Sequence, residues 1–473
     1  MSTHDLPHMS SLSSTDALRI SGYFIAIYLI YAVLSAIYNA YFGPLSKFPG
    51  PLSRKLSRLP ELYTLYHGDE ASEHVRLHEQ YGPVVRISPT KLSYAGGAKP
   101  FKDIYGFRKH GQASLQKDPQ FYGKPFNNRK LLSHTFADKT LKDLEPLLKS
   151  WVEKMRTKLE ERMDAVEKVD ILKYYNCTTF DIMGDLSFSE GLDMLENGEY
   201  SSWVKTIFLG INIDSRIRAC KMINWFTEWF VNNFIMSNAK VRVKIYEHHN
   251  YSILEKSKGP DGLSIKEHHS NASTFMVAGT ETTATALSGV TYHLLRNPEY
   301  LQKLTQEIRG SHSRSEDITM ESLQPLKYLH AVLQEGLRMY PPVPSMLPRR
   351  VPKGGAIVCD EFLPKGTSIG VHHLSTYRSE DSFKDPYKFA PERWLGDEKY
   401  KDDHLDSLEL FSVGPRNCIG KNLAWHEMRL ILATTLFNFD LKLCEESKKW
   451  TDQKVYTLWE KIPLMVTLAP AAR

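Results

Sequence analysis

The chain contains few cysteines, and their spacing argues against two common uses of the thiol group. Among 473 residues there are only five, and they lie far apart, at Cys177, Cys220, Cys359, Cys418 and Cys444. The number is odd and no C-x-x-C pair occurs, which argues against a disulfide framework and against a zinc site. We therefore expect reduced thiols in a domain that faces the cytosol, most of them as small core fillers.

The sequence also lacks a strong excess of one charge. It has 60 Lys and Arg residues against 55 Asp and Glu residues, a net charge of +5. This balance gives no basis for nucleic-acid binding, so we expect no nucleic-acid partner. A basic patch that meets an acidic protein partner is the simpler expectation. Short-period repeats and long low-complexity runs are missing as well, which excludes a repeat architecture.

Long hydrophobic runs are missing everywhere except at one place. Residues 20–42 carry no charge, and as a helix they would span about 35 Å, enough to cross the hydrocarbon core of a bilayer. The alternatives are a buried core helix and a cleaved signal peptide, which has a shorter apolar region and a small-residue cleavage site. We predict a single-pass transmembrane anchor.

The charges beside this run predict its orientation. Only Arg19 precedes it closely, whereas four basic residues follow it, namely Lys47, Arg54, Lys55 and Arg58. The positive-inside rule then places the C-terminal side in the cytosol. We expect a lumenal N-terminus (1–19), the anchor (20–42), a basic and proline-rich linker (43–59) and a cytosolic catalytic domain (60–473).

The body of the chain reads as mainly α with small β-sheets. Helical patterns dominate residues 129–300, and further helices are expected at 322–340 and at about 422–437. Short strand-like runs occur within 70–100 and within 341–400, where Pro and Gly are frequent. The aromatic stretch 222–236 reads best as a buried helix. The alternative is a surface that dips into the bilayer beside the anchor.

One short loop, FSVGPRNCIG at residues 411–420, carries the most specific chemistry. Gly414 and Gly420 allow the backbone to approach a flat macrocycle closely. Amide groups that follow Cys418, at the start of the next helix, can stabilise a thiolate. A thiolate ligand on haem iron favours cleavage of the O–O bond. In this interpretation Arg416 pairs with a haem propionate and Phe411 shields the sulfur from water.

Two other patterns are ambiguous when they are taken alone. Glu335 and Arg338 share one face of a helix, as do the members of many surface ion pairs of little energetic value. Within AGTETT, Gly279 costs about 1 kcal/mol relative to alanine in a helix. Glu281 and Thr282 are polar in an apolar run, and a packed polar turn with a threonine bonded to the preceding carbonyl would account for them.

Taken together, these segments resemble the cytochrome P450 family. FSVGPRNCIG matches its FxxGxRxCxG haem loop. AGTETT (278–283) resembles its oxygen-activation motif, EGLR (335–338) its ExxR motif, and PERW (391–394) the segment that completes the ExxR cluster, all in the family's order. The resemblance extends from the anchor to the C-terminus and implies the cytochrome P450 fold with haem b (iron protoporphyrin IX).

The resemblance also implies how the cofactor is held. Cys418 would be the iron ligand, and Glu335, Arg338 and Arg393 would form a buried triad that locks the haem-binding core. Arg349 matches a position that pairs with one propionate. His372 and His373 are expected to alternate along a strand as structural residues.

The implied activity is a monooxygenase reaction. Thr282 and Glu281 would deliver protons during dioxygen activation, as a hydrogen-bonding alcohol and an acid. A haem-thiolate isomerase or dehydratase has no use for such a proton relay. Electrons would come from NADPH through NADPH-cytochrome P450 reductase, which would dock near Lys421. The likeness to microsomal enzymes of filamentous fungi implies the endoplasmic reticulum membrane and an apolar small-molecule substrate of secondary metabolism.

One segment departs from the family pattern. In FYGKPFNNRKLLSHTF, Arg129 keeps the place of an arginine that holds the other propionate. Pro125 stands where an aromatic residue or histidine is usual, and about a dozen residues are missing by the usual loop length. This shortening leaves an alternative open, a catalytically impaired haem-binding membrane protein. A single-pass scaffold without haem is a third alternative.

Overall fold

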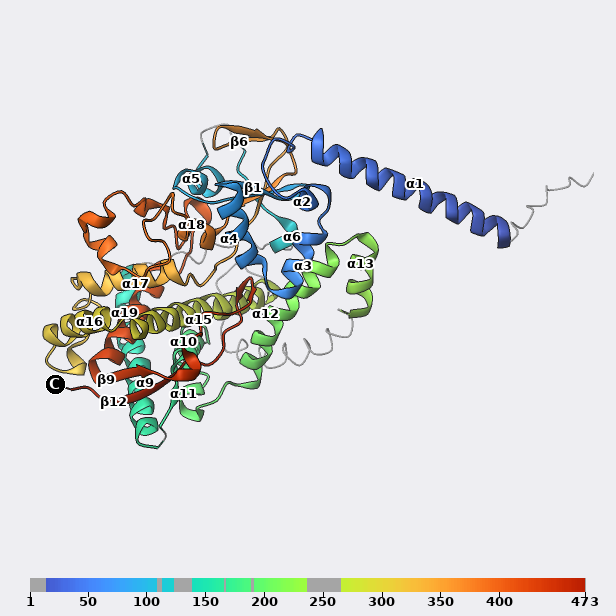
Figure 1. Ribbon diagram of the computed structural model, residues 1–473. Coiled ribbons are helices and arrows are strands. Elements are labelled where there is room, and N and C mark those ends of the chain that lie inside the picture. Colours follow the sequence, from blue (N-terminus) through green and yellow to red (C-terminus); the bar gives the residue numbers. More distant parts are fainter. Residues whose placement is uncertain are drawn as a thin grey trace, which may run out of the picture.

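The computed structural model describes residues 14–108, 113–122, 138–165, 167–188, 191–235 and 265–472. Helices dominate this part of the chain, and sheets are small and peripheral (Figure 1). The α-helices are α1 (Ser14–Tyr41), α2 (Leu52–Leu56), α3 (Leu59–His67), α4 (Glu70–Tyr81), α5 (Lys99–Tyr105), α6 (Pro119–Tyr122), α8 (Asp138–Asp143), α9 (Glu145–Ala165), α10 (Ile171–Phe188), α11 (Met194–Asn197), α12 (Ser202–Lys221), α13 (Trp225–Phe230), α15 (Ile265–Arg296), α16 (Pro298–Ser311), α17 (Lys327–Met339), α18 (His373–Tyr377) and α19 (Lys421–Asn438).

The strands are short, and none of the described ones exceeds six residues. Five of them form one sheet in the order β1-β2-β8-β5-β3, with β2 and β8 parallel and the other neighbours antiparallel. Three form a second sheet in the order β4-β12-β9, and β6–β7 and β10–β11 are hairpins. The strands are β1 (Val84–Ser88), β2 (Lys91–Tyr94), β3 (Gln116–Lys117), β4 (Val169–Asp170), β5 (Arg349–Arg350), β6 (Ala356–Val358), β7 (Glu361–Leu363), β8 (Ser368–Val371), β9 (Phe439–Leu443), β10 (Val455–Tyr456), β11 (Leu458–Trp459) and β12 (Met465–Pro470).

Helix α15 runs through the middle of the body and organises the core (Figure 1). α10 and α17 pack along it, and α19 packs against both α15 and α9. Many of the side chains that α15 buries are small or aliphatic, such as Ala284, Leu287 and Val290. Its threonines satisfy their hydroxyl groups by donating to carbonyls four residues earlier, as Thr282 and Thr283 do. The predicted mainly α fold with small sheets is therefore confirmed.

The N-terminal helix stands apart from this core. α1 projects away from the body (Figure 1). Its segment Leu18–Tyr41, 24 residues long, is the one helix of the described residues that is long and apolar enough to cross a membrane. Its most apolar 18-residue window has no buried residue, and Ala40, near the C-terminal end of the segment, is buried.

Three local expectations were wrong. The stretch 222–236 is not a buried helix: it forms α13 and a single π-helical turn, η1 (Val231–Ile235), and Phe226 and Trp229 are 54% and 49% exposed. The helix expected over 322–340 begins only at Lys327. His373 does not continue a strand, because it starts α18, for which His372 is the N-cap. Both histidines are buried in the core, as structural residues are.

Candidate active site

A cavity of about 350 Å³ lies where α15, α19 and the cysteine loop meet. Most of the side chains around it are apolar, which suits a flat apolar cofactor and an apolar substrate. Four polar residues that matter for its chemistry also line it, namely Cys418, Arg416, Arg349 and Thr282. These residues are far apart in the sequence, and the fold brings them to one place.

The conformation of the cysteine loop requires a glycine at position 414. Gly414 has a φ of +76°, and a Cβ atom there would lie 2.2 Å from the Tyr105 carbonyl oxygen. The backbone N–H of Cys418 donates to the Phe411 carbonyl at 2.7 Å, which closes the loop. Cys418 is exposed toward the cavity, and α19 begins three residues later, at Lys421. Gly420, the N-cap of α19, also lines the cavity, as the haem-loop interpretation requires.

Phe411 lines the cavity beside Cys418 and packs against Trp425, with 6.1 Å between ring centroids. An aromatic ring at this position would keep water from the neighbourhood of the sulfur. The charge density on a thiolate ligand depends on such exclusion, because burial and hydrogen bonding tune a metal site. The structure therefore places Phe411 in the same cavity wall as Cys418, and its shielding of the sulfur stays a prediction.

Two arginines give the cavity a positive wall. Arg349 is buried and donates to the Tyr122 hydroxyl at 3.0 Å. Burial lowers the pKa of the Arg416 guanidinium, and the nearby Arg349 lowers it further. In the described part of the chain neither arginine forms an ion pair with a carboxylate. Two neighbouring cations, Arg349 buried and Arg416 partly exposed, without a carboxylate partner fit a ligand that brings its own carboxylates, as the propionates of haem do.

Residues of α15 form another part of the cavity wall. The Thr282 hydroxyl donates to the Ala278 carbonyl at 2.6 Å, and both residues line the cavity. Gly279 lies between them in the same wall, and a Cβ atom there would lie 2.8 Å from the Met183 sulfur. The absence of a side chain at Gly279 thus lets α10 approach α15 beside the cavity.

The structure places Glu281 differently from Thr282. Its carboxylate is 3% exposed and forms an ion pair with Lys461, whose Nζ lies 2.9 Å away. The carboxylate is not part of the cavity wall. Lys461 also donates to the Thr285 hydroxyl at 2.9 Å, one turn further along α15. Sequence reasoning missed Lys461, which lies 180 positions from Glu281 and belongs to no motif. The carboxylate of the predicted acid, Glu281, therefore lies outside the cavity wall.

The buried ion pair of Glu281 and Lys461 leads to a prediction about the stability of the fold. We expect Lys461→Met to destabilise the fold by about 3–5 kcal/mol, because removing one partner leaves a buried charge uncompensated. The double variant Lys461→Met, Glu281→Gln should recover most of the loss. Lys448→Met, which breaks an exposed pair with Glu445 at 2.8 Å, serves as the control and should cost less than about 1 kcal/mol. Equal shifts of the urea denaturation midpoint for both lysines would contradict this prediction.

The predicted buried triad is present in the core, outside the cavity wall. Arg338 donates to both oxygens of Glu335 at 2.8 and 2.9 Å, and Arg393 donates to the same carboxylate at 3.1 Å. Trp394 Nε1 adds a fourth bond at 3.0 Å. All three charged side chains are completely buried. Burial raises the pKa of Glu335, but Arg338 and Arg393 outweigh it and hold the pKa below its ordinary value.

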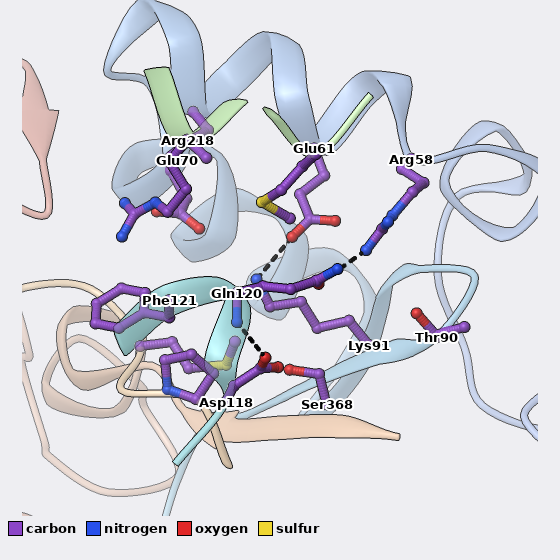
Figure 2. A pocket seen from close by; sticks show the side chains of 14 residues that line it. Arg58, Glu61, Glu70, Thr90, Lys91, Asp118, Gln120, Phe121, Arg218 and Ser368 are labelled. Atoms are coloured by element: carbon purple, nitrogen blue, oxygen red, sulfur yellow. Dashed lines mark hydrogen bonds and ion pairs between the residues drawn. The ribbon is translucent and has the colours of Figure 1, made fainter. Parts of the chain in front are cut away.

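A second, much smaller cavity lies on the other side of α6. It measures about 30 Å³, room for about two water molecules, and charged side chains surround it (Figure 2). Lys91 and Glu61 pair across it at 2.6 Å, and Arg58 donates to Gln120 at 3.2 Å. Asp118, Gln120 and Phe121 line this cavity while Tyr122 lines the larger one. The short helix α6 is therefore the wall between a polar and an apolar space.

Arg129 lies outside the described residues, as does the shortened segment before it. Of the remaining predicted site residues, six line one cavity: Thr282, Arg349, Phe411, Arg416, Cys418 and Gly420. Gly414 shapes the cysteine loop, and Glu281 and the buried triad lie outside the cavity wall. A thiol, a positive wall and an apolar volume fit a haem held by cysteine. Fold and site together are those expected of a haem-thiolate protein.

Comparison with known proteins agrees with this class. The family model described as cytochrome P450 matches residues 56–256 and 206–467. Cytochrome P450 monooxygenase efuB of Hormonema carpetanum is 44% identical over 489 residues, which cover 95% of this chain and 96% of the relative. Cytochrome P450 monooxygenase astA of Talaromyces wortmannii is 38% identical, over 94% of this chain and 96% of its own. The trichothecene C-15 hydroxylase of Fusarium sporotrichioides is 37% identical, over 93% and 96%.

The chain therefore belongs to the cytochrome P450 family, and it is a monooxygenase of the type found in fungal secondary metabolism. The family implies haem as the cofactor. The family membership predicted from four short motifs is thus confirmed. The relatives are named as monooxygenases, which does not favour a catalytically impaired haem-binding protein.

Proposed function

We propose that this protein is a membrane-anchored monooxygenase that inserts one oxygen atom of O₂ into an apolar small molecule. Electrons come from NADPH through NADPH-cytochrome P450 reductase. The observation that carries the proposal is the single cavity with Cys418 in one wall and Thr282 in another. A cysteine ligand and a hydrogen-bonding alcohol on separate elements are what oxygen activation at a thiolate-ligated haem needs.

Different residues of this chain would bind the cofactor, shield the sulfur from water and hold a proton in the cavity. When bound, haem supplies the dioxygen binding, O–O cleavage and oxygen transfer that side chains cannot perform. Cys418 would hold the iron, and Arg349 and Arg416, with Arg129 as a third candidate, would bind the propionates. Phe411 keeps water from the sulfur, and the Thr282 hydroxyl, anchored to the Ala278 carbonyl at 2.6 Å, holds a proton at a fixed place in the cavity.

Thr282→Ala tests the position of this hydroxyl. We expect NADPH consumption with reductase to continue while the yield of oxidised product per NADPH falls on the order of tenfold to a hundredfold, because a positioned proton donor is lost. Hydrogen peroxide should account for the missing electrons. The measurement is the ratio of product and peroxide to NADPH consumed. Thr280→Ala, which removes a buried hydroxyl of the same helix that does not line the cavity, is the control and should keep the native ratio.

The lining of the cavity indicates the class of substrate. Phe275, Ala278, Val343 and Leu347 present aromatic and aliphatic groups to it. Such a lining binds by desolvation of apolar surface and selects by shape. The relatives act in fungi, and one is named as a trichothecene hydroxylase. We infer an apolar secondary metabolite as the substrate, presented to the cavity on its α15 side.

The membrane supplies the second part of the proposal. The apolar helix α1 would anchor the protein in the endoplasmic reticulum membrane as a single pass, with residues 1–19 in the lumen. Residues 43–59 would link it to a catalytic domain, 60–473, in the cytosol. The exposed aromatic rings of α13 would dip into the same membrane, since bilayer surfaces bind such rings. The reductase would dock near Lys421, beside the cysteine loop.

Incubation of the purified full-length protein with reductase, NADPH and an extract of apolar fungal metabolites tests this function. We expect haem of the thiolate type and a product whose mass has increased by one oxygen atom, labelled when ¹⁸O₂ is supplied. Haem retained without any NADPH consumption would instead support the impaired haem-binding protein.

A further inference from the structure

We propose that Lys117 and Tyr122 form a carboxylate-binding site at one end of the active-site cavity, and that the substrate is an apolar skeleton that bears one carboxylate. The inference rests on the proposed function, because it concerns what that monooxygenase oxidises. Lys117 ends β3 and Tyr122 ends α6, so both belong to one short segment of the chain, and both line the cavity. Arg349 of β5 lines the cavity beside them.

Two cations face each other across neighbouring strands at this end of the cavity. The register of β3 and β5 sets Lys117 opposite Arg349, and residues in opposite positions project from the same face of a sheet. The ring of Tyr122 is near both: Lys117 Nζ lies 4.8 Å from the ring centroid, and the guanidinium carbon of Arg349 lies 5.5 Å from it. Like charges in opposite positions destabilise a sheet. An anion bound beside them would offset this cost.

The neighbouring arginine of β5 shows how the fold pairs such a cation when it supplies the acid itself. Arg350 donates to Asp118 at 2.6 Å, and Asp118 lines the small polar cavity on the other side of α6 (Figure 2). Among the described residues that line the active-site cavity, the one acid is Glu427. Burial raises the pKa of Glu427 to about 8, so around neutral pH it is uncharged. The described wall of the active-site cavity therefore carries positive charge without a matching carboxylate.

Haem accounts for part of this positive charge and leaves a remainder. Three cationic side chains line the cavity, namely Lys117, Arg349 and Arg416, and haem brings two propionates. Arg349 and Arg416 are the arginines proposed to bind those propionates, with Arg129 as a third candidate. Lys117 is then the additional cation, half-buried beside the ring of Tyr122. Because buried charges in proteins are paired, a carboxylate of the substrate fits this position.

Tyr122 supplies the second contact to the carboxylate. Its hydroxyl oxygen accepts a hydrogen bond from Arg349 at 3.0 Å, so its own hydrogen is available to a ligand. Burial raises the pKa of Tyr122, and the neighbouring Arg349 and Arg416 offset only part of that rise, so the phenol stays protonated. An ammonium group and a phenol O–H together offer a carboxylate two charge-assisted hydrogen bonds.

The two ends of the cavity then bind different parts of one molecule. Lys117 and Tyr122 bind the carboxylate, whereas the apolar wall that includes Phe275 and Ala278 of α15 binds the skeleton. Thr282 lies in the same α15 wall. The carbon that is oxidised therefore belongs to the apolar skeleton and not to the carboxyl end.

Matched ligands test this site without turnover. The holoprotein is titrated in a calorimeter, near neutral pH, with dodecanoic acid and abietic acid and with the methyl ester of each. We expect at least one acid to bind on the order of tenfold to a hundredfold more tightly than its own ester, because the ester cannot form the charge-assisted bonds. Lys117→Met should abolish this preference, and Lys117→Arg should keep most of it. Wild-type protein that binds neither acid more tightly than its ester would overturn the proposal.

Two further variants keep the test specific. Lys154 also lies beside an aromatic ring, 5.0 Å from the centroid of Trp151, but it does not line the cavity. Lys154→Met is therefore the control and should keep the preference for the acid. Tyr122→Phe removes only the hydroxyl group and should weaken the preference on the order of threefold to tenfold. It replaces Lys117→Met if that variant folds poorly, and an unchanged preference in Tyr122→Phe would then count against the site.

Haem content identifies the carboxylate that Lys117 binds. If Lys117 held a haem propionate instead, Lys117→Met would lower the affinity for haem and leave the acid-to-ester preference unchanged, which would refute the proposal. The reduced CO-bound spectrum reports separately on the proposed function. A thiolate-type Soret band in wild-type protein that shows no preference for acids rejects this inference alone, whereas the absence of that band rejects the monooxygenase function itself.

Discussion

Replacing Glu335 with glutamine should leave little folded protein that holds haem. The substitution removes the carboxylate that faces two completely buried guanidinium groups, those of Arg338 and Arg393. Breaking a buried pair costs about 3–5 kcal/mol. Arg338 pairs with Glu335 alone among the described carboxylates, whereas Arg393 also pairs with the buried Asp403, so we expect a loss within that range. A typical domain has only about 5–15 kcal/mol of stability in total. Haem content after expression and the urea denaturation midpoint measure the effect.

A matched control lies close to the triad in sequence. Glu392, beside Arg393, pairs with Lys303 at 2.9 Å near the surface. Glu392→Gln should lower stability by less than about 1 kcal/mol, because such pairs are solvated. If Glu335→Gln behaved like Glu392→Gln, the buried triad would not be the structural centre of the haem-binding core.

Replacing Cys418 with alanine should have the opposite profile, a small effect on the fold and a complete effect on chemistry. The side chain is exposed toward the cavity, so the stability of the cofactor-free protein should change by less than about 0.5 kcal/mol. Oxidation of the substrate should be abolished, because no other described cysteine lines the cavity to replace the thiolate. Circular dichroism, haem content and product formation measure these effects.

Cys177→Ala provides the contrast. Cys177 is buried in the core, and burial raises the pKa of its thiol to about 12, so it stays a neutral core filler. We expect this variant to lose stability and keep its haem-thiolate chemistry. Substrate oxidation at an undiminished rate by Cys418→Ala would refute the assignment of the iron ligand.

The parts of the site that sequence reasoning located share one property: each is encoded by residues close together in the chain. The loop 411–420 carries its own turn-forming glycines and its thiol. Glu335 and Arg338 are three residues apart on one helix. Thr282 lies in the short segment 278–283, which is ambiguous alone and was identified by its resemblance to the family's oxygen-activation motif. Arg393 required the family resemblance, because nothing local links it to Glu335.

The parts that were missed depend on contacts between distant segments. Lys461 meets Glu281 only because the C-terminal hairpin returns to α15. Glu427 follows the haem loop closely, yet its lack of hydrogen-bond partners is a property of packing against α15 and cannot be read from a helical pattern. The exposure of Phe226 and Trp229 depends on what covers α13, and the pattern of an aromatic helix is the same whether it is buried or exposed.

The absorption spectrum of the reduced, carbon monoxide-bound full-length protein tests the central claim most directly. A cysteine thiolate on the iron shifts the Soret band to the long-wavelength position that distinguishes haem-thiolate proteins. The structure predicts that band for the wild type and its loss in Cys418→Ala. A Soret band at the position of histidine-ligated haem, or no haem absorption at all, would contradict a thiolate-ligated haem in this cavity.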